Sequence, residues 1–337
     1  MEKVLTVSVA AYNVESTLED ALKPFTKCEY KDVLEVLIID DGSTDDTSII
    51  GKRYQSKYPS IFRLISKKNG GWGSTLNTGI ENGTGKYFKQ LDGDDYFSAK
   101  NLDYLLRFLI STHADLVYTP FVTFEDTNKS ILRKIGAYEH IPYEEMMSLK
   151  ELNDFIPAMH TLAVRMDVLK NNHITITEHC FYTDVEFVLK VCNYCRTITF
   201  FELPIYYYRL ARSGQSMSIS GVRKHYKDHL KMLLQMLEYE SDNVTRQEVK
   251  NIFESRLTAA CEMQYIFFFA LKGTDSQKKE LKCFDRILKE KYPFYYARIK
   301  NGAVDILRKM NFWGYSIIGH IQTLRDKQKK INIFEGC

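Results

Sequence analysis

The amino-acid sequence predicts an α/β fold, in which a mostly parallel, mixed sheet is flanked by helices and followed by a C-terminal helical region. Three observations predict it. Strand-like and helix-like stretches alternate through the first 121 residues, which is typical of parallel sheets with crossover helices. Polar clusters follow directly after the strand-like stretches, where ligands bind in such sheets. From about residue 222 the pattern changes to long helical stretches, so we expect a first domain at residues 1–221 and a helical region at residues 222–337.

The first 121 residues alternate regularly. Their strand-like stretches are short, apolar and rich in β-branched residues, at residues 4–10, 33–39, 61–65, 87–91 and 114–121. Helix-like stretches lie between them, at residues 16–26, 44–58, 74–82 and 100–112. We expect Pro24 to end the first of these helices early, because proline has no N–H to donate. We expect Asp45 and Asp46 in the first turn of the second helix, where the helix dipole favours anions.

The rest of the chain is less regular at first and then strongly helical. Between residues 122 and 221 we predict one helix at residues 183–195 and two short strands around Pro204, within residues 198–209. Four helices are predicted beyond residue 222, at residues 224–239, 246–271, 276–291 and 293–308. Pro293 suits the first position of the last helix, where no N–H is needed.

Length and composition describe an ordinary globular protein with one domain and an appendage. The chain has 337 residues, of which 45% are hydrophobic and 26% are charged. A net charge of +3 gives no reason to expect nucleic acid as a partner. The seven cysteines are scattered, no signal peptide is recognised, and the longest apolar run, residues 265–271, is far shorter than the roughly 20 residues that span a bilayer. We therefore expect a cytoplasmic protein.

Two aspartates with a glycine between them follow the strand predicted at residues 87–91. Asp92 and Asp94 offer hard oxygen ligands that suit Mn²⁺ or Mg²⁺, cations that commonly hold substrate phosphates as well. Gly93 lets the backbone turn between them. The alternative is a solvated turn, because Asp-Gly is a common turn dipeptide. With Asp95, three aspartates lie within four residues, and they repel one another unless a cation or hydrogen-bond donors compensate, which favours the metal site.

Two further polar segments follow predicted strands. Asp41 comes after the strand at residues 33–39 and could accept hydrogen bonds from a ring N–H or a ribose hydroxyl. A helix-capping turn is the alternative, and the two readings are compatible. The glycine loop (residues 68–74) precedes a predicted helix, and such loops expose backbone N–H groups that could face an anion. Its glycine spacing matches neither a P-loop nor a dinucleotide-binding fingerprint.

The second half of the predicted domain carries three candidate groups. Asp184 begins a predicted apolar helix and could act as a general base. The alternative is that it and Glu186 are first-turn acids that stabilise the helix dipole. Arg209 and Arg212 place two cations near a turn, which suits a diphosphate, and a solvated surface loop is the alternative. For His160 we expect a structural role.

Taken together, the motifs resemble those of the family 2 inverting glycosyltransferases, which have the GT-A fold. The matching residues are Ala10-Ala11-Tyr12-Asn13, Ile39-Asp40-Asp41-Gly42-Ser43-Thr44-Asp45, Asn69-Gly70-Gly71, Asn77-Thr78-Gly79-Ile80, Gly85-Lys86-Tyr87 and Leu91-Asp92-Gly93-Asp94-Asp95. Their order and spacing cover residues 3–96, and the middle of the chain matches more loosely.

The resemblance implies a reaction. A hexose or N-acetylhexosamine would move from a UDP-sugar donor to a hydroxyl of a glycan acceptor, with inversion. Residues 1–96 would form the nucleotide-binding half and residues 97–221 the acceptor-binding half. Asp92 and Asp94 would hold the metal, Mn²⁺ or Mg²⁺, and Asp184 would deprotonate the acceptor hydroxyl.

The resemblance also implies a set of donor-binding residues. They are Ala11, Tyr12, Asp41, Asn69, Gly71, Asn77, Asp92, Gly93, Arg209 and Arg212. Tyr12 would stack on the uracil, and Asp41 would hydrogen-bond to it. The sequence departs from the family pattern at three positions: Ala11 replaces a frequent Pro, Leu76 replaces a usual Arg, and Thr183 replaces a usual Glu.

Two other functions remain open. A sugar-phosphate nucleotidyltransferase shares a similar nucleotide-binding sheet, although its Gly-x-Gly-Thr-Arg signature is missing. A non-catalytic nucleotide-sugar-binding protein is the other, and Asp92, Asp94 and Asp184 argue against it. The acceptor could be a cell-surface polysaccharide, a lipid-linked glycan or a protein-bound glycan. Residues 304–330 mix aromatic and apolar residues with Lys and Arg, which is typical of a segment that lies on an anionic membrane surface, here the inner face of the plasma membrane. A packing helix or a homodimer contact explains them equally well.

Overall fold

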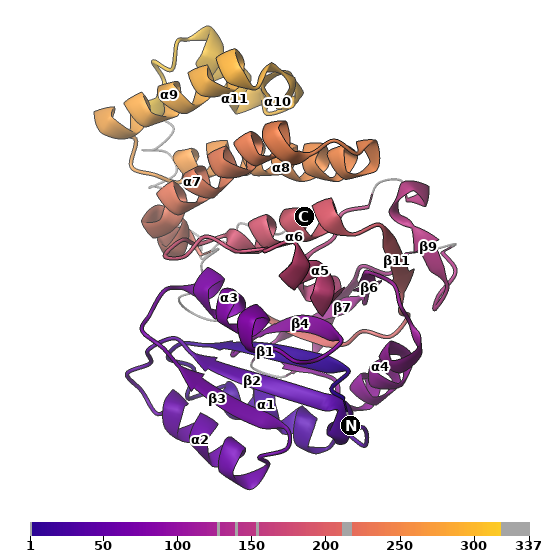
Figure 1. The fold of residues 1–337 in the computed structure, drawn as a ribbon. Coiled ribbons are helices and arrows are strands. Elements are labelled where there is room, and N and C mark those ends of the chain that lie inside the picture. Colours follow the sequence, from indigo (N-terminus) through magenta and orange to yellow (C-terminus); the bar gives the residue numbers. More distant parts are fainter. Residues whose placement is uncertain (1, 127–128, 139–140, 153–154, 211–217, 318–337) are drawn as a thin grey trace. The chain divides into compact units, whose positions relative to one another are not determined.

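The structure, a computed structural model of the whole chain, describes residues 2–126, 129–138, 141–152, 155–210 and 218–317 (Figure 1). The chain divides into two compact units, residues 1–212 and residues 213–337. The boundary predicted after residue 221 falls in the first turn of helix α7 (Ile219–Asn243).

An eight-stranded mixed sheet forms the centre of the first unit, with the strand order β3-β2-β1-β4-β10-β6-β11-β9. Its strands are β1 (Leu5–Ala11), β2 (Leu34–Asp40), β3 (Phe62–Ser66), β4 (Tyr87–Asp92), β6 (Leu116–Tyr118), β9 (Met146–Ser148), β10 (Leu162–Arg165) and β11 (Thr197–Phe200). The neighbours β3, β2, β1 and β4 are parallel, whereas β10 runs antiparallel to β4 and β6. β1 and β2 are buried along nearly their whole length because helices cover both of their faces. The predicted mostly parallel, mixed sheet is confirmed.

Helices lie on both faces of this sheet (Figure 1). α1 (Leu18–Thr26) and α2 (Thr47–Lys57) cover one face, and α3 (Trp72–Asn82), α5 (Met166–Asn171) and α6 (Thr183–Tyr194) cover the other, while α4 (Ala99–Ser111) precedes β6 in the chain. α1 shows why such a helix packs here. Its buried residues, Leu18, Ala21, Leu22 and Phe25, follow the i, i+3, i+4, i+7 spacing that places side chains on one helix face.

A second, smaller sheet has the strand order β5-β12-β7-β8. Its strands are β5 (Tyr96–Phe97), β7 (Phe121–Glu125), β8 (Ile131–Ile135) and β12 (Tyr206–Leu210). β12 pairs with β5, which follows directly after the turn at residues 92–95, so segments more than a hundred residues apart lie side by side. The single strand predicted at residues 114–121 is wrong. Pro120, which cannot donate to a sheet ladder, separates β6 from β7.

Two predicted helix boundaries are also wrong. Pro24 does not end its helix early but lies inside α1, which runs to Thr26. A proline in the last turn removes only one intrahelical hydrogen bond. α2 begins at Thr47 instead of residue 44. The Asp45 carboxylate accepts a hydrogen bond from the Thr47 N–H at 3.0 Å, and such local side-chain bonds compete with helix formation.

The second unit is helical. Its helices are α7, α8 (Gln247–Phe269), α9 (Asp275–Lys291), α10 (Pro293–Arg298) and α11 (Gly302–Lys309). The single helix predicted at residues 293–308 is wrong, because Asn301 breaks it and caps α11 by accepting two backbone N–H groups. Between α7 and α8, His229 Nδ1 lies 2.7 Å from Gln264 Oε1. Across the described residues, no helix combines the length and the apolarity that crossing a bilayer requires.

Candidate functional site

The carboxyl ends of β1, β2, β3 and β4 meet along one edge of the large sheet. Ala11 lies opposite Asp40, Asp40 lies opposite Ser66, and Ala10 lies opposite Asp92. Ligands of open α/β sheets bind beyond this edge. The structure therefore gathers at one place the polar segments that the sequence predicts as a nucleotide-binding site.

Asp92 ends β4 and is half-buried. Trp72, the first residue of α3, donates a hydrogen bond from Nε1 to Asp92 Oδ1 at 2.7 Å. Burial and then the charge of Asp94 raise the pKa of Asp92 to about 7, and the Trp72 hydrogen bond opposes this rise. A side chain at Gly93 has no room, because its Cβ would lie 2.8 Å from the Ala10 carbonyl oxygen. The aspartate turn (residues 92–95) is thus held tightly against β1.

Asp95 is buried and bonded to β12. Its Oδ2 accepts a hydrogen bond from the Tyr206 hydroxyl at 2.6 Å, and its Oδ1 accepts one from the Arg209 backbone N–H at 2.7 Å. Burial and the charges of Asp94 and Asp92 raise the pKa of Asp95 well above its usual range. This residue therefore anchors the aspartate turn to the smaller sheet.

The aspartate turn offers ligands that fit a divalent cation. One ligand atom each of Asp92, Asp95 and His160 lies within 4.8 Å of the others, and the Asp94 side chain is half-buried beside them in the turn. The His160 ring stacks on Phe121 at 4.9 Å. Carboxylates suit Mn²⁺ or Mg²⁺, and an imidazole nitrogen suits Mn²⁺ better than Mg²⁺. His160, expected to be structural, thus belongs to the group that could face a metal.

Asp41 follows β2 and holds the glycine loop from inside. Its Oδ1 accepts hydrogen bonds from Lys67 Nζ at 2.8 Å and from the Gly70 N–H at 2.9 Å, and its Oδ2 accepts one from the Gly71 N–H at 2.8 Å. The Asn69 side-chain amide donates to the Asp41 carbonyl oxygen. Gly71 adopts a φ of 82°, a conformation that glycine reaches without strain. The predicted base-binding carboxylate is therefore fixed in position by its own loop.

Tyr12 follows β1 with 51% of its surface exposed, whereas Ala11 is buried. Asn13 has a left-handed φ of 52°. Its Oδ1 accepts a hydrogen bond from the Thr44 N–H at 2.9 Å, and its own N–H donates to Ser43 Oγ at 3.0 Å. These bonds join the end of β1 to the turn after β2, so the Tyr12 ring stays at the solvent edge, where a flat base can stack.

Asn77, on α3, is engaged by a distant segment. Its Nδ2 donates to the Ile176 carbonyl oxygen at 2.9 Å, and its Oδ1 accepts from the Ile176 N–H at 2.8 Å. The same segment packs against α3 at Gly73, where a Cβ would lie 2.2 Å from the Thr177 carbonyl oxygen. Donor binding by Asn77 stays a prediction, and the structure adds that this side chain ties α3 to the segment before α6.

Asp184 lies in the first turn of α6. Its charge contributes to the raised pKa of Asp92, and its role as a general base stays a prediction. Glu186 is buried and accepts hydrogen bonds from the Thr177 N–H at 3.2 Å and from Lys190 Nζ at 2.7 Å. Glu186 therefore holds the segment before α6.

The structure describes only one of the two arginines predicted to contact a diphosphate. Arg209 is 2% exposed, its Nε donates to the Asp94 carbonyl oxygen, and its guanidinium pairs with Asp126 and Asp20. Its charge is thus committed to protein partners, and the diphosphate contact stays a prediction. Arg212 lies outside the described residues.

Three residues at the site carry roles that the sequence analysis missed. Trp72 lies within the glycine loop, and this position could have marked it as a site residue. Tyr206 gives no such signal, because its role depends on strand pairing. Lys89 is fully buried in the middle of β4 and donates to the carbonyl oxygens of His160 at 2.9 Å and Leu162 at 3.1 Å. Burial lowers its pKa to about 7. A lysine inside the strand predicted at residues 87–91 could have marked Lys89 as a residue with a special role.

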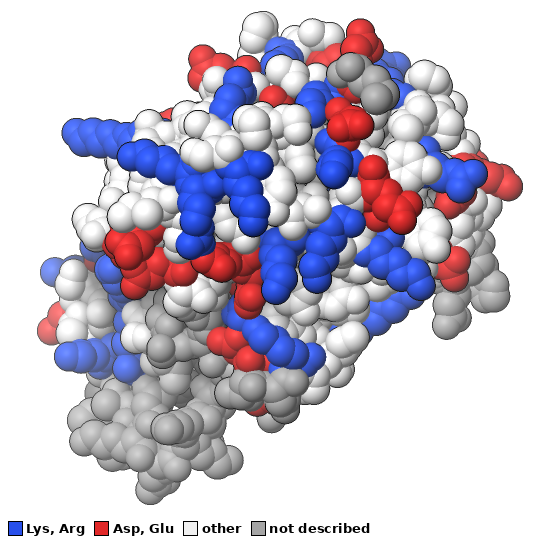
Figure 2. All heavy atoms as spheres, turned by 90° about the horizontal axis from the view of Figure 1, so that it is seen from below, with Lys and Arg blue, Asp and Glu red and all other residues white. Residues whose placement is uncertain are grey.

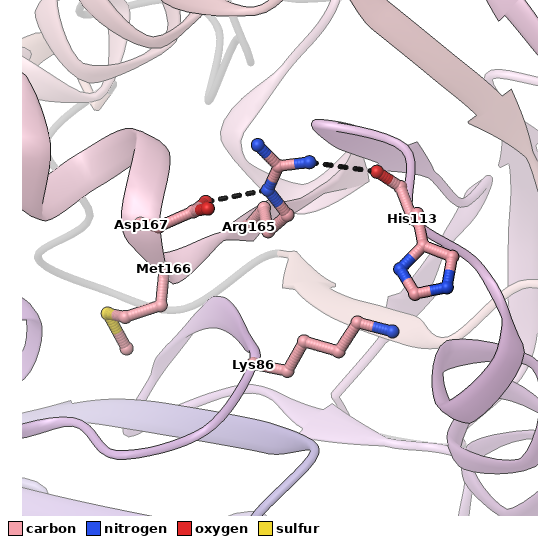
Figure 3. Close-up of a pocket in the computed structure, with 5 residues that line it drawn as sticks. All are labelled: Lys86, His113, Arg165, Met166 and Asp167. Atoms are coloured by element: carbon pink, nitrogen blue, oxygen red, sulfur yellow. Dashed lines mark hydrogen bonds and ion pairs between the residues drawn. The ribbon is translucent and has the colours of Figure 1, made fainter.

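A pocket of about 470 Å³ lies at the opposite end of β4 (Figure 3). It is lined by Lys86, His113, Arg165, Met166 and Asp167. Lys86 Nζ donates to the Thr112 carbonyl oxygen at 2.6 Å, and Arg165 Nε donates to Asp167 at 2.6 Å. A strand rises about 3.3 Å per residue, so Lys86 lies roughly 20 Å from Asp92 along β4. This pocket is therefore separate from the candidate site.

Figure 2 shows one face of the molecule with Lys and Arg lying among Asp and Glu. In the first unit, the exposed side chains of Arg53 on α2 and Glu19 on α1 form an ion pair. Such mixing of charges is typical of a solvated surface.

The sequence matches known proteins. The model of the family described as glycosyl transferase family 2 matches residues 6–172. The cholesterol galactosyltransferase of Borreliella burgdorferi is 22% identical over 279 residues, which cover 80% of this chain and 75% of that protein. The poly(ribitol-phosphate) beta-N-acetylglucosaminyltransferase TarS of Staphylococcus aureus is 25% identical over 219 residues, which cover 64% of this chain and 37% of TarS. The matched residues thus make up well under half of full-length TarS.

Solved structures share the fold. TarS 1–349 in complex with UDP superposes with a TM-score of 0.64 at 18% identity and covers 99% of this chain and 95% of that one. The same TarS segment in complex with UDP-GlcNAc gives a TM-score of 0.61. A mannosyltransferase from Pyrobaculum calidifontis in complex with GDP-Man and Mn²⁺ gives a TM-score of 0.52 at 14% identity, and the match covers 97% of this chain and 88% of that one.

Proposed function

Because the chain belongs to glycosyl transferase family 2 and has the GT-A fold, we propose that it is a metal-dependent, inverting glycosyltransferase. In this proposal it moves a hexose or N-acetylhexosamine from a UDP-sugar to a hydroxyl group of a glycan acceptor. The observation that carries the proposal is the convergence at one sheet edge of the aspartate turn, Asp41 and the exposed Tyr12 ring. In this proposal the turn is the cation site, Tyr12 is the stacking platform, and Asp184 on α6 is the base.

The donor lies along the carboxyl edge of the sheet in this proposal. Tyr12 stacks on the uracil, and Asp41 Oδ2 accepts a hydrogen bond from it. Asp92 and Asp94 hold the divalent cation, and Asp92 also contacts the ribose. When bound, Mn²⁺ or Mg²⁺ neutralises charge on the departing diphosphate. The complexes of TarS with UDP and UDP-GlcNAc, and of the mannosyltransferase with Mn²⁺, support these ligand classes.

Asp184 is the general base in this proposal. Its carboxylate takes the proton of the acceptor hydroxyl as the hydroxyl oxygen attacks the anomeric carbon of the sugar. The bond from that carbon to the UDP oxygen breaks in the same displacement, and the configuration of the anomeric carbon inverts. Asp184 lies in the first turn of α6. The helix dipole favours anions at this position, and the anionic carboxylate is the form that a base requires.

The acceptor and the cellular location are also part of the proposal. In the second unit, Ile306, Met310, Trp313 and Ile317 are exposed, with Trp313 at 74%. Ile306 lies on α11, and the other three follow the end of that helix at Lys309. An exposed Trp among aliphatic residues suits the interface of a membrane. We therefore place the enzyme in the cytoplasm, at the inner face of the plasma membrane, with a lipid-linked glycan as the first acceptor to test. Flotation with anionic liposomes checks this, and a Trp313→Ser variant should float less than the parent.

Product analysis tests the reaction. The purified chain is incubated with Mn²⁺ and UDP-GlcNAc, UDP-glucose or UDP-galactose, and the released products are identified. UDP release that requires metal agrees with the proposal. Pyrophosphate release from a nucleoside triphosphate and a sugar phosphate would instead identify a nucleotidyltransferase, and binding without turnover a donor-binding protein. Asp184→Asn should remove turnover, whereas Asp167→Asn, a change of the same kind at the opposite end of β4, should not.

A further inference from the structure

Strand β12 touches the aspartate turn at both ends of the turn. The Tyr206 hydroxyl donates to Asp95 Oδ2 at 2.6 Å and accepts a hydrogen bond from the Asp92 backbone N–H at 3.2 Å. Tyr206 is fully buried. One oxygen atom therefore bridges the first and the last residue of the turn.

Arg209, three residues further along β12, contacts the same turn. Its backbone N–H donates to Asp95 Oδ1 at 2.7 Å, and its Nε donates to the Asp94 carbonyl oxygen. The two other guanidinium nitrogens pair with Asp126, after β7, and with Asp20, on α1. The guanidinium also lies over the Phe124 ring, with its carbon 5.1 Å from the ring centroid. Arg209 thus joins the turn to three other parts of the first unit.

These contacts hold the backbone that carries Asp92 and Asp94, the two residues that the proposed function assigns to the metal. The backbone at Asp92, the carbonyl of Asp94 and both carboxylate oxygens of Asp95 each bond to β12. A metal site needs its ligands in place before the ion arrives, because disorder in the ligands lowers affinity. The hydrogen bonds from β12, a strand paired on both sides, hold the aspartate turn in one conformation.

We propose that Tyr206 and Arg209 are positioning residues that hold the aspartate turn in its metal-binding geometry. In this inference Arg209 acts through the turn and not on the diphosphate. The inference rests on the proposed function and goes beyond it by assigning the metal affinity of the site to β12. Two affinities distinguish this role from direct binding of the diphosphate: the affinity for Mn²⁺ in the presence of UDP, and the affinity for UDP without metal. An arginine that bound the diphosphate would change both, whereas a positioning arginine changes only the first.

Trp72 gives a direct readout. It is one of two tryptophans in the chain, and its indole bonds to Asp92. The other, Trp313, is 74% exposed, so a Trp313→Phe background isolates the Trp72 fluorescence. In that background, Mn²⁺ is titrated in the presence of UDP, and UDP is titrated separately in EDTA.

The test variant is Tyr206→Phe, which removes one oxygen atom and leaves the ring. Tyr87→Phe is the matched control, because Tyr87 is also buried, lies at the other end of β4, and donates to two backbone carbonyl oxygens. Losing two buried hydrogen bonds should weaken Mn²⁺ binding about tenfold in Tyr206→Phe. We expect UDP affinity in EDTA to stay at the parent value. Tyr87→Phe should lower the melting temperature but leave Mn²⁺ affinity unchanged.

Arg209→Lys tests the second half of the inference, since lysine keeps the charge and loses the fork of donors. It should weaken Mn²⁺ binding and leave UDP binding in EDTA unchanged. Weaker UDP binding in EDTA would show that Arg209 contacts the diphosphate and would overturn the inference, as would parental Mn²⁺ affinity in a folded Tyr206→Phe protein. If the parent itself binds neither UDP nor Mn²⁺, the proposed function is wrong and the inference falls with it.

Discussion

Gly73 should tolerate no side chain, and the structure allows the cost of Gly73→Ala to be worked out. The new Cβ would lie 2.2 Å from the Thr177 carbonyl oxygen and 3.0 Å from Ile176 Cγ2. A carbon and a carbonyl oxygen in contact lie about 3.3 Å apart, so α3 and the segment at 176–177 must separate by about 1 Å. This movement is resisted by the two hydrogen bonds between Asn77 and Ile176.

The expected magnitude follows from opposing contributions. Alanine favours a helix interior over glycine by about 1 kcal/mol. Overpacking costs about 1–3 kcal/mol, and strained or lost hydrogen bonds add about 1 kcal/mol each. The net loss of stability for Gly73→Ala is thus about 2–4 kcal/mol. Because the displaced segment leads to Asp184, the transfer rate should fall as well, by up to about 100-fold for a displacement of this size.

Urea unfolding and the rate of UDP release measure the two effects. Two alanine substitutions serve as controls. A Cβ at Gly302 meets nothing within 4 Å, so Gly302→Ala should be neutral or slightly stabilising. A Cβ at Gly51 meets Leu64 Cδ1 at 2.8 Å, and that side chain can rotate away. Gly73→Ala with parental stability and parental rate would show that the contact with Thr177 does not govern this site.

Three further predictions concern single groups. Asp184→Asn should lower the transfer rate by a factor of about 10²–10⁴, which is the usual contribution of a general base. UDP binding, followed by calorimetry, should stay at the parent value. A fully active variant would remove the base assignment. Trp72→Phe removes a hydrogen bond that lowers the pKa of Asp92, so that pKa should rise and the pH dependence of Mn²⁺ binding should move to higher pH; an unchanged profile would contradict this. Burial lowers the pKa of His229 to about 4, which is below its value in the unfolded chain. As pH falls, the unfolded chain therefore takes up the proton first. The free energy of unfolding should fall by up to about 1.4 kcal/mol per pH unit between about pH 6.5 and about pH 4. His229→Gln should lessen that slope in urea unfolding curves measured by circular dichroism, and an equal slope in both proteins would refute the assignment.

The large sheet was predictable because its signals are local. The β-branched run before Asp40 and the aspartate turn after β4 each carry their own pattern, and the register of parallel strands then places their ends together. β8 was not predictable in this way. All five of its residues are exposed, so its sequence shows no alternation between a buried and a solvated face.

The roles of individual site residues were harder to predict than the strands. Two arginines near a turn suggest a diphosphate, but the partners of Arg209 come from α1, the residue after β7 and the aspartate turn. No local pattern contains that information, because the pairing of β12 with β5 and β7 brings these groups together. Glu186 shows the same limit, since its first-turn position hides the bond to Thr177.

The bonds between Asn77 and Ile176 also have a consequence during protein synthesis. The two residues are 99 positions apart, and a ribosome adds about 5–20 residues per second. The nascent chain therefore spends roughly 5–20 seconds with α3 made and its covering segment not yet made. During that interval the Gly73 end of α3 lacks its neighbours Ile176 and Thr177. A chain stalled before residue 176 therefore has its parallel strands but not the segment that covers this end of α3, nor Asp184, Tyr206 and Arg209, which follow in the chain.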